Sequence, residues 1–158
     1  MKIGEALARK KLLKNKLLEL QKLQRTTFFV EEGKKKEADF DELSGEISKV
    51  LEELRELKLK TQNANLKTFV DWNAKNISLA EAILNIGDLR SQFAHLDKLE
   101  DDDRSFGNRS FYDRKTKDEV EYIPQKTRTE IVELKKKLEA EKTALDNLLQ
   151  NTNWQVEI

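Results

Sequence analysis

The sequence predicts a mainly α-helical fold: an antiparallel four-helix bundle or coiled coil built from two tandem helical hairpins. Apolar residues recur in alternating steps of three and four along four long segments, which is the spacing of one helix face. Charged residues make up 38% of the 158 residues and aromatic residues only 7%. That balance is typical of long helices with narrow apolar stripes. The length fits a single helical domain, residues 1–158.

Each expected helix has its own apolar stripe. The second stripe is unbroken and comprises Phe40, Leu43, Ile47, Val50, Leu54 and Leu57. The third comprises Leu79, Ala82, Ile86, Leu89, Phe93 and Leu96. The fourth is broken at Glu141 and comprises Ile131, Leu134, Leu138, Leu145 and Leu148. The first is interrupted by Lys10 and comprises Ile3, Ala6, Leu13, Leu17 and Leu20. All four stripes need an apolar partner, which favours a bundle.

The boundaries of the later helices carry capping signals. Ser78 and Glu81 have the spacing of a capping box, so the third helix is expected to begin near Leu79. The fourth begins soon after Pro124, capped by either Thr127 or Thr129, and runs to about residue 150.

Two segments interrupt the helical pattern. Residues 26–39 contain Gly33 and a lysine run at 34–36, and are expected to form a loop. Residues 106–124 alternate in the manner of strands around a charged turn, and predict a small β-hairpin inserted between the third and fourth helices. Because a lone hairpin is marginal in water, it is expected to rest on the bundle or on another subunit.

The two halves of the chain resemble one another. Residues 3–23 align with 79–99 at a constant offset of 76, and the match includes Glu5-Ala6 with Glu81-Ala82. Residues 62–66 resemble 150–154 at an offset of 88 through a shared Gln-Asn-x-Asn. Heptad spacing alone does not explain these matches, so the sequence predicts an internal duplication of residues 1–70 and 77–158.

The chain resembles, over nearly its whole length, a septicolysin-like family of small bacterial helical proteins of largely unknown role. The residues that carry this resemblance are Glu5-Ala6-Leu7, Asn65-Leu66-Lys67-Thr68, Leu79-Ala80-Glu81-Ala82, Asp88-Leu89, Val120, Tyr122, Leu134 and Asn153-Trp154. The lysine-rich first loop and Ile123-Pro124 depart from the family pattern. The family name implies haemolysis, and no residue of this chain explains lysis.

Aromatic residues outside the stripes, together with the neighbouring Val30, are the candidate interface. They are Phe28, Phe29, Val30, Phe111, Tyr112, Tyr122, Trp72 and Trp154. Neighbouring aromatics in a loop pack on another subunit or insert into a membrane interface, and subunit packing is favoured over insertion.

Charge is balanced overall, with 30 basic and 30 acidic residues, but the first 25 residues have a local net charge of +6. The candidate basic surface comprises Lys10, Lys11, Lys14 and Lys16. These residues are expected to face solvent and pair with Glu52, Glu53 and Glu56; the alternative is phosphate or membrane binding. The acidic run at 100–103 requires compensation, either by Arg104, Arg109 or Arg114 or by a divalent cation.

No catalytic, cofactor or metal site is predicted. The chain has no cysteine and a single histidine, His95, and its five glycines form no phosphate-binding loop. No apolar run reaches 18 residues and no signal peptide is evident, so a cytoplasmic location is expected. The leading hypothesis is a non-enzymatic scaffolding protein that forms a homo-oligomer. The alternatives are a membrane-active, cytolysin-like protein and, more weakly, a nucleic-acid binder.

Overall fold

The computed structural model describes residues 1–101 and 124–158. This part of the chain contains the helices α1 (Ile3–Thr26), α2 (Phe40–Lys67), α3 (Leu79–Asp101) and α5 (Arg128–Asn153), and the strands β1 (Phe69–Trp72) and β2 (Lys75–Ser78). The described part of the chain is therefore mainly helical, as the sequence predicted, and it includes a small antiparallel hairpin. Contacts divide the chain into two compact units. The first contains Met1–Ala80 and Gln150–Ile158, and the second contains Glu81–Leu149.

The helices begin where side chains satisfy free backbone N–H groups. Asp39 accepts hydrogen bonds from the backbone N–H groups of Asp41 (2.9 Å) and Glu42 (3.1 Å) at the start of α2. Thr127 and Glu130 form a reciprocal capping box at the start of α5, with distances of 2.8 and 3.2 Å. Of the two threonines that the sequence offered as caps, Thr127 has this role.

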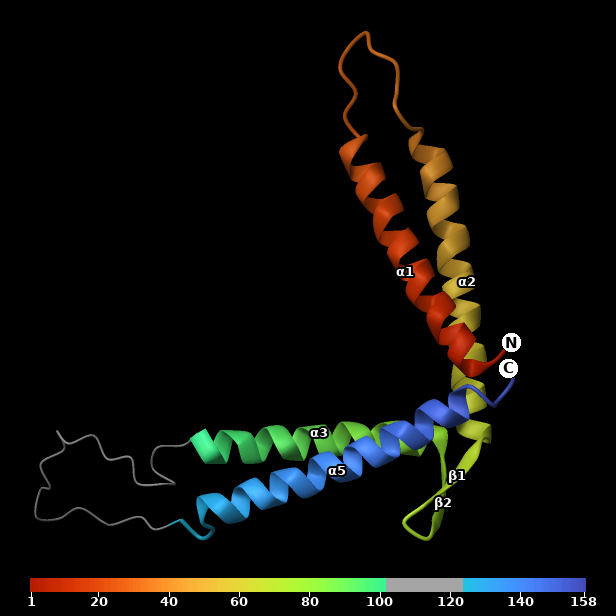
Figure 1. The fold of residues 1–158 in the computed structure, drawn as a ribbon. Coiled ribbons are helices and arrows are strands. Elements are labelled where there is room, and N and C mark those ends of the chain that lie inside the picture. The colour runs from red at the N-terminus through yellow and green to blue at the C-terminus, as the bar shows by residue number, and fades with distance from the viewer. Residues whose placement is uncertain (102–123) are drawn as a thin grey trace, which may run out of the picture. The chain divides into compact units, whose positions relative to one another are not determined.

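The first unit is a long helical hairpin in which α1 and α2 run antiparallel side by side (Figure 1). Its buried apolar residues include Ile3 and Ala6 at the start of α1. The stripe on α2 is buried at Leu43, Val50, Leu54 and Leu57 and continues to Thr61, whose hydroxyl donates to the carbonyl of Leu57 (2.6 Å). Near the loop the two helices are joined by the amide of Gln24, which donates to the hydroxyl of Ser44 (2.7 Å).

A two-stranded hairpin that the sequence pattern did not indicate follows α2 directly. Strands β1 and β2 pair from Phe69 opposite Ser78 to Trp72 opposite Lys75. The two-residue turn consists of Asn73 and Ala74, both with positive φ (49° and 60°). The hairpin that the sequence predicted at 106–124 lies outside the described residues except for Pro124.

The two ends of the chain also pair with each other. The N–H of Ile3 donates to the carbonyl of Val156 (3.0 Å), and the N–H of Ile158 donates to the carbonyl of Met1 (2.8 Å). Lys2 and Glu157 face each other in an antiparallel bridge between these bonds. Both termini therefore lie in the first unit, as Figure 1 shows.

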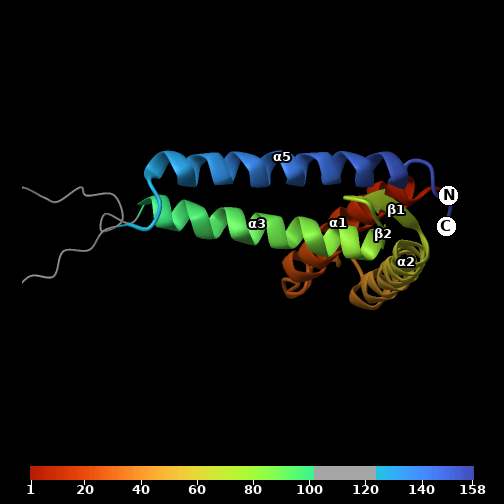
Figure 2. The same cartoon turned by 90° about the horizontal axis from the view of Figure 1, so that it is seen from below.

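In the second unit α3 and α5 lie side by side in both views (Figures 1 and 2). The buried residues here are Ala82, Ile86, Ile131, Leu145 and Leu149. Two details of the expected stripe on α5 are wrong. Leu134 is 39% exposed, and Leu149 is buried more deeply than its neighbour Leu148. A strict seven-residue repeat drifts by about 20° per heptad on a straight helix, so the buried position moves to a neighbouring residue. Packing of the two hairpins into one four-helix bundle remains a prediction.

Candidate interaction surface

The loop between α1 and α2, residues 27–39, carries the most exposed aromatic side chain of the described residues. We call it the aromatic loop. Helix α1 closes before it because the backbone N–H of Thr27 and the hydroxyls of Thr26 and Thr27 all donate to the carbonyl of Leu23, at 2.8–3.0 Å. The carboxylate of Asp39 then caps the start of α2. The hydrogen bonds that it accepts from the backbone N–H groups of Glu42 and Asp41 lower its pKa. Both ends of the loop are therefore held by hydrogen bonds.

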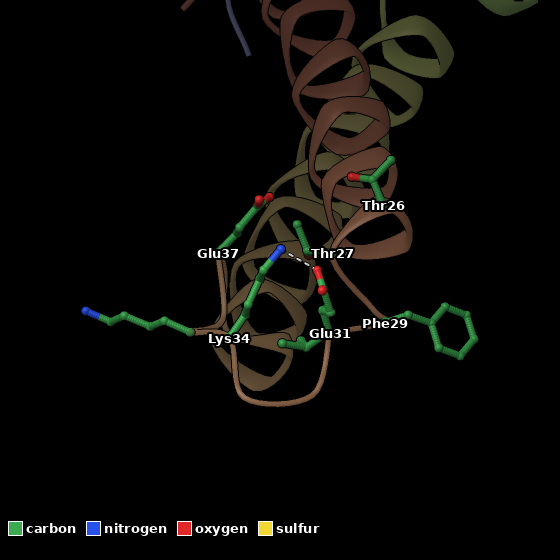
Figure 3. A pocket seen from close by; sticks show the side chains of 8 residues that line it. Thr26, Thr27, Phe29, Glu31, Lys34 and Glu37 are labelled. Carbon is green, nitrogen blue, oxygen red and sulfur yellow. Dashed lines mark ion pairs between the residues drawn. The ribbon is translucent and has the colours of Figure 1, made fainter.

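Three phenylalanines gather at the base of the aromatic loop. The ring of Phe28 lies edge-on to Phe29, with centroids 5.0 Å apart, and to Phe40, with centroids 5.7 Å apart. Edge-to-face pairs of this kind are favourable, yet Phe28 is 57% exposed and Phe29 is 88% exposed. Figure 3 shows the Phe29 ring directed away from the other labelled side chains. Val30 is also exposed, so the phenylalanines and Val30 offer apolar surface to a partner.

Four of the seven charged side chains of the aromatic loop are paired within it. Lys34 forms an ion pair with Glu31 (Figure 3), and Lys36 lies 3.6 Å from the carboxylate of Asp39. Gly33 provides the turn between them with a φ of +83°. A hollow of about 260 Å³ lies inside this turn, lined by residues that include Thr26, Glu31 and Glu37. Ligand sites usually enclose ~300–1,000 Å³ and are mostly apolar, so this small polar hollow is a poor ligand site.

The two tryptophans among the candidates do not share this surface. Trp72 is half-buried at the end of β1. The 28 residues of α2 separate it from the aromatic loop, which at 1.5 Å per residue is about 42 Å. Trp154 is half-exposed and its indole lies over Gly4 at the start of α1, so it is a packing residue in the first unit. The remaining candidates, Phe111, Tyr112 and Tyr122, lie outside the described residues.

The basic residues of α1 are only partly free to contact phosphates. Lys10 is half-buried on the face toward α2, and burial together with the charges of Lys14 and Lys58 lowers its pKa. The side chains of Lys11, Lys14 and Lys16 are exposed, as expected. Arg9 forms an ion pair with Glu53, one of the three acidic residues that the sequence proposed as partners. The basic surface is therefore smaller than the sequence suggested.

A cluster of charges across α3 and α5 was not predicted. The ammonium of Lys135 forms ion pairs with Asp97 and with Glu100 (2.8 Å), and lies 5.1 Å from the ring centroid of Phe93. Arg128 also pairs with Glu100, at 3.3 Å. Glu100 begins the acidic run for which the sequence proposed a nearby arginine or a cation. The partners that the structure describes, Arg128 and Lys135, come from α5, which only the tertiary structure brings close. The arginines that the sequence proposed, Arg104, Arg109 and Arg114, lie outside the described residues.

The Lys135 cluster makes stability depend on pH in a direction that can be tested. Hydrogen bonding to Lys135, and then to Arg128, lowers the pKa of Glu100 below its ordinary value of 4.5. The pairing therefore stabilises the fold above that value, and the stabilisation is lost as the pH falls through the lowered pKa. We expect Lys135→Met to lower the melting temperature at pH 7, and the difference from the original protein to shrink toward pH 3.

The control for this measurement is Lys136→Met, which removes an exposed lysine next to Lys135. It should have little effect at any pH, because surface charges of this kind contribute little. Thermal unfolding followed by circular dichroism at a series of pH values measures both variants. A deficit in Lys135→Met that is the same at pH 7 and pH 3 would contradict the assignment.

The described residues contain no cluster of three or more His, Asp or Glu side chains that could hold a metal ion. His95 is exposed on α3 and borders a shallow hollow with Ser91, Gln92 and Leu138. None of the helices within 1–101 and 124–158 has the length and apolarity needed to cross a membrane.

The fold and the aromatic loop define a protein of paired long helices with an apolar tip. The sequence matches a family described as "Family of unknown function (DUF6847)" over residues 9–158, and the chain belongs to this family. A solved structure described as a functionally unknown conserved protein from Corynebacterium diphtheriae is similar, with a TM-score of 0.81 and 23% sequence identity. The similarity covers 100% of this chain and 98% of that one, and shows the fold alone. No curated protein matches the chain. The septicolysin-like resemblance remains a prediction.

Proposed function

We propose that the protein is a non-enzymatic scaffold that associates with a second copy of itself through the aromatic loop. The observation that carries this proposal is the exposure of Phe28, Phe29 and Val30 at the tip of a long helical hairpin. Aromatic residues are enriched at the centres of protein interfaces, where one ring fills a pocket on the partner. A ring as exposed as that of Phe29 adds little to the stability of the chain itself.

A second copy suits the charge pattern of the loop. The acidic residues Glu31 and Glu32 precede Gly33, and the lysines 34–36 follow it. In a dimer with two-fold symmetry the same patch lies on both sides of the interface. Two loops that meet antiparallel place Glu32 of one copy against Lys35 of the other and leave the pairs within each loop in place. Complementary charges of this kind set the register of an interface.

The test of this proposal is Phe29→Ser. We expect it to lower the fraction of associated protein, because it removes exposed apolar surface that association buries, while the melting temperature changes little. Light scattering coupled to size exclusion over a range of concentrations measures the mass directly. The matched control is Leu12→Gln, which removes an apolar side chain that is 68% exposed on α1. Equal loss of association in both variants, or a monomeric original protein, would refute the aromatic loop as the interface.

Insertion of the aromatic loop into lipid is the competing proposal. The loop holds four acidic and three basic residues, and two of its lysines are already paired with its own carboxylates. Interfacial segments that bind anionic lipid usually carry an excess of basic residues, so protein packing is favoured. Leakage from anionic liposomes separates the two proposals. We expect none at micromolar protein; leakage that Phe29→Ser abolishes would support lipid insertion instead.

A further inference from the structure

The secondary structure repeats at two constant offsets along the chain. Helix α1 begins at Ile3 and α3 at Leu79, an offset of 76. Helix α2 begins at Phe40 and α5 at Arg128, an offset of 88. The capping residues Asp39 and Thr127 are also 88 apart. Residues buried at equivalent positions include Ile3 with Leu79, Ala6 with Ala82, Leu43 with Ile131, and Leu57 with Leu145.

The strand pairs repeat at the same offsets. After α2, the N–H of Leu79 donates to the carbonyl of Thr68 (2.9 Å). After α5, the N–H of Ile3 donates to the carbonyl of Val156 (3.0 Å). The acceptor Val156 lies 88 residues after Thr68, and the donor Ile3 lies 76 residues before Leu79. The facing residues Phe69 and Ser78 in the hairpin correspond in the same way to Glu157 and Lys2 at the termini. Coiled-coil periodicity does not produce such agreement in backbone hydrogen bonds.

We infer that the chain consists of two repeats, residues 1–73 and 74–158, which pair with each other through their strands. We further infer that the first repeat of one copy can pair in the same way with the second repeat of another copy. Each repeat ends in a strand that pairs with the strand leading into the other repeat. The terminal pair has no covalent connection between its strands. The hairpin pair is connected only by the turn at Asn73 and Ala74. This turn decides whether repeats pair within one chain or between two, which is domain swapping.

The turn stores strain that opening releases. Both of its residues have positive φ, which is the requirement of a type I′ turn. Asparagine tolerates this region, but alanine does not adopt it readily because its Cβ approaches the following carbonyl oxygen. The swapped dimer keeps the strand hydrogen bonds and relaxes two such turns. This route to self-association does not depend on the aromatic loop.

A disulfide between the terminal strands reports which repeats are paired. Lys2 and Glu157 are exposed and face each other between the flanking hydrogen bonds, where Cα atoms are about 4.5 Å apart, within the range of a disulfide. The chain has no cysteine of its own, so every disulfide in the variant Lys2→Cys/Glu157→Cys involves these two positions, and peptide mapping identifies the bond between positions 2 and 157. In a closed monomer the bond lies within one chain. In a swapped dimer it joins two chains, and the protein runs at twice 18.5 kDa on a denaturing, non-reducing gel.

Two substitutions at the turn move the equilibrium in opposite directions. Ala74→Val places a β-branched residue at positive φ and adds strain to the closed turn. The dimerisation constant should rise by about 100-fold, because two turns open in each dimer and the relief of strain in each contributes a factor of about ten. Ala74→Gly removes the strain and should lower the constant. Each is measured in the double-cysteine background after refolding at high protein concentration and oxidation. Ala74→Gly should remain folded, so the comparison holds even if Ala74→Val is unstable.

The outcomes separate this inference from the proposed scaffold function. Covalent dimer that rises in Ala74→Val and falls in Ala74→Gly supports the exchange of repeats. The exchange of repeats would be overturned if the disulfide lies within single chains in the double-cysteine protein and in both of its Ala74 variants. This holds even if light scattering still shows association that depends on Phe29. Covalent dimer that is unaffected by Phe29→Ser supports the exchange and leaves the aromatic loop to be judged on its own test.

Discussion

The variant Leu79→Ala is expected to lose about 3 kcal/mol of unfolding free energy, because removal of a buried leucine side chain leaves a cavity that the surroundings fill only in part. Leu79 is fully buried, with 0% of its surface exposed. It also stands where β2 becomes α3, and its N–H donates to the carbonyl of Thr68. The strand pair and the start of the helix therefore both depend on how this side chain packs.

The control for Leu79→Ala is Leu84→Ala, which makes the same change on the same helix at a position that is 68% exposed. That variant should lose less than about 0.5 kcal/mol, because surface substitutions away from packed sites have small effects. Urea unfolding followed by circular dichroism measures both values. The inferred repeat adds a second expectation, since Ile3→Ala at the equivalent position should cost about as much as Leu79→Ala. Similar losses in Leu79→Ala and Leu84→Ala would contradict the core described above.

The variant Gly4→Ala is expected to lose about 2 kcal/mol, although alanine normally stabilises a helix relative to glycine. A Cβ at residue 4 would lie 2.7 Å from Cδ2 of Trp154 and 2.8 Å from Cε2, closer than carbon atoms pack. The clash is with the body of the indole ring and not with a flexible end. Either the ring leaves α1 or the terminal strand pair next to it shifts, and both changes lose contacts in the first unit.

The same substitution in the Trp154→Ala protein tests this explanation, because the change in unfolding free energy should reverse its sign there. In Trp154→Ala the ring is gone, so Gly4→Ala should no longer destabilise and should gain up to about 0.5 kcal/mol from helix propensity. The four proteins of this double-mutant cycle are compared by urea unfolding. If Gly4→Ala destabilises equally in both backgrounds, the close approach of Trp154 is not the cause.

Sequence periodicity was sufficient for the helices because their signals are local. The alternating steps of Leu43, Ile47, Val50 and Leu54 identify a helix face without knowledge of its partner. The start of α3 at Leu79 agrees with the boundary expected from Ser78 and Glu81, and the start of α5 agrees with the cap expected at Thr127. Caps involve residues two or three positions apart, so they are visible in the sequence.

The hairpin of β1 and β2 was missed because its local signals are weak. The strands have only four residues each, and their turn is Asn-Ala, which lacks the glycine that marks most type I′ turns. The structure holds Ala74 at positive φ through the pairing of the strands on either side. Strand pairing and packing outweigh the preference of alanine for negative φ, and sequence patterns give no direct signal of either.

The residues of the candidate interface also differ in how far the sequence alone could place them. The exposed aromatics Phe28 and Phe29 could be chosen from the sequence, because adjacent aromatic residues in a loop have no core to enter. The separation of Trp72 from them could not, since it depends on the length of α2 and on the direction in which the chain leaves it. The packing of Trp154 on Gly4 joins residues 150 positions apart, and no local pattern indicates it.

The sequence by itself determined the helical class, most of each apolar stripe and the approximate boundaries of the helices, because these follow from the spacing of neighbouring residues. Tertiary structure alone decided which charges meet, as with Lys135 and Glu100, and which strands pair, as with Lys2 and Glu157. The physical reason is that ion pairs and strand ladders between distant segments depend on where the folded chain places those segments. Local preference predicts an element, but only packing selects its partner.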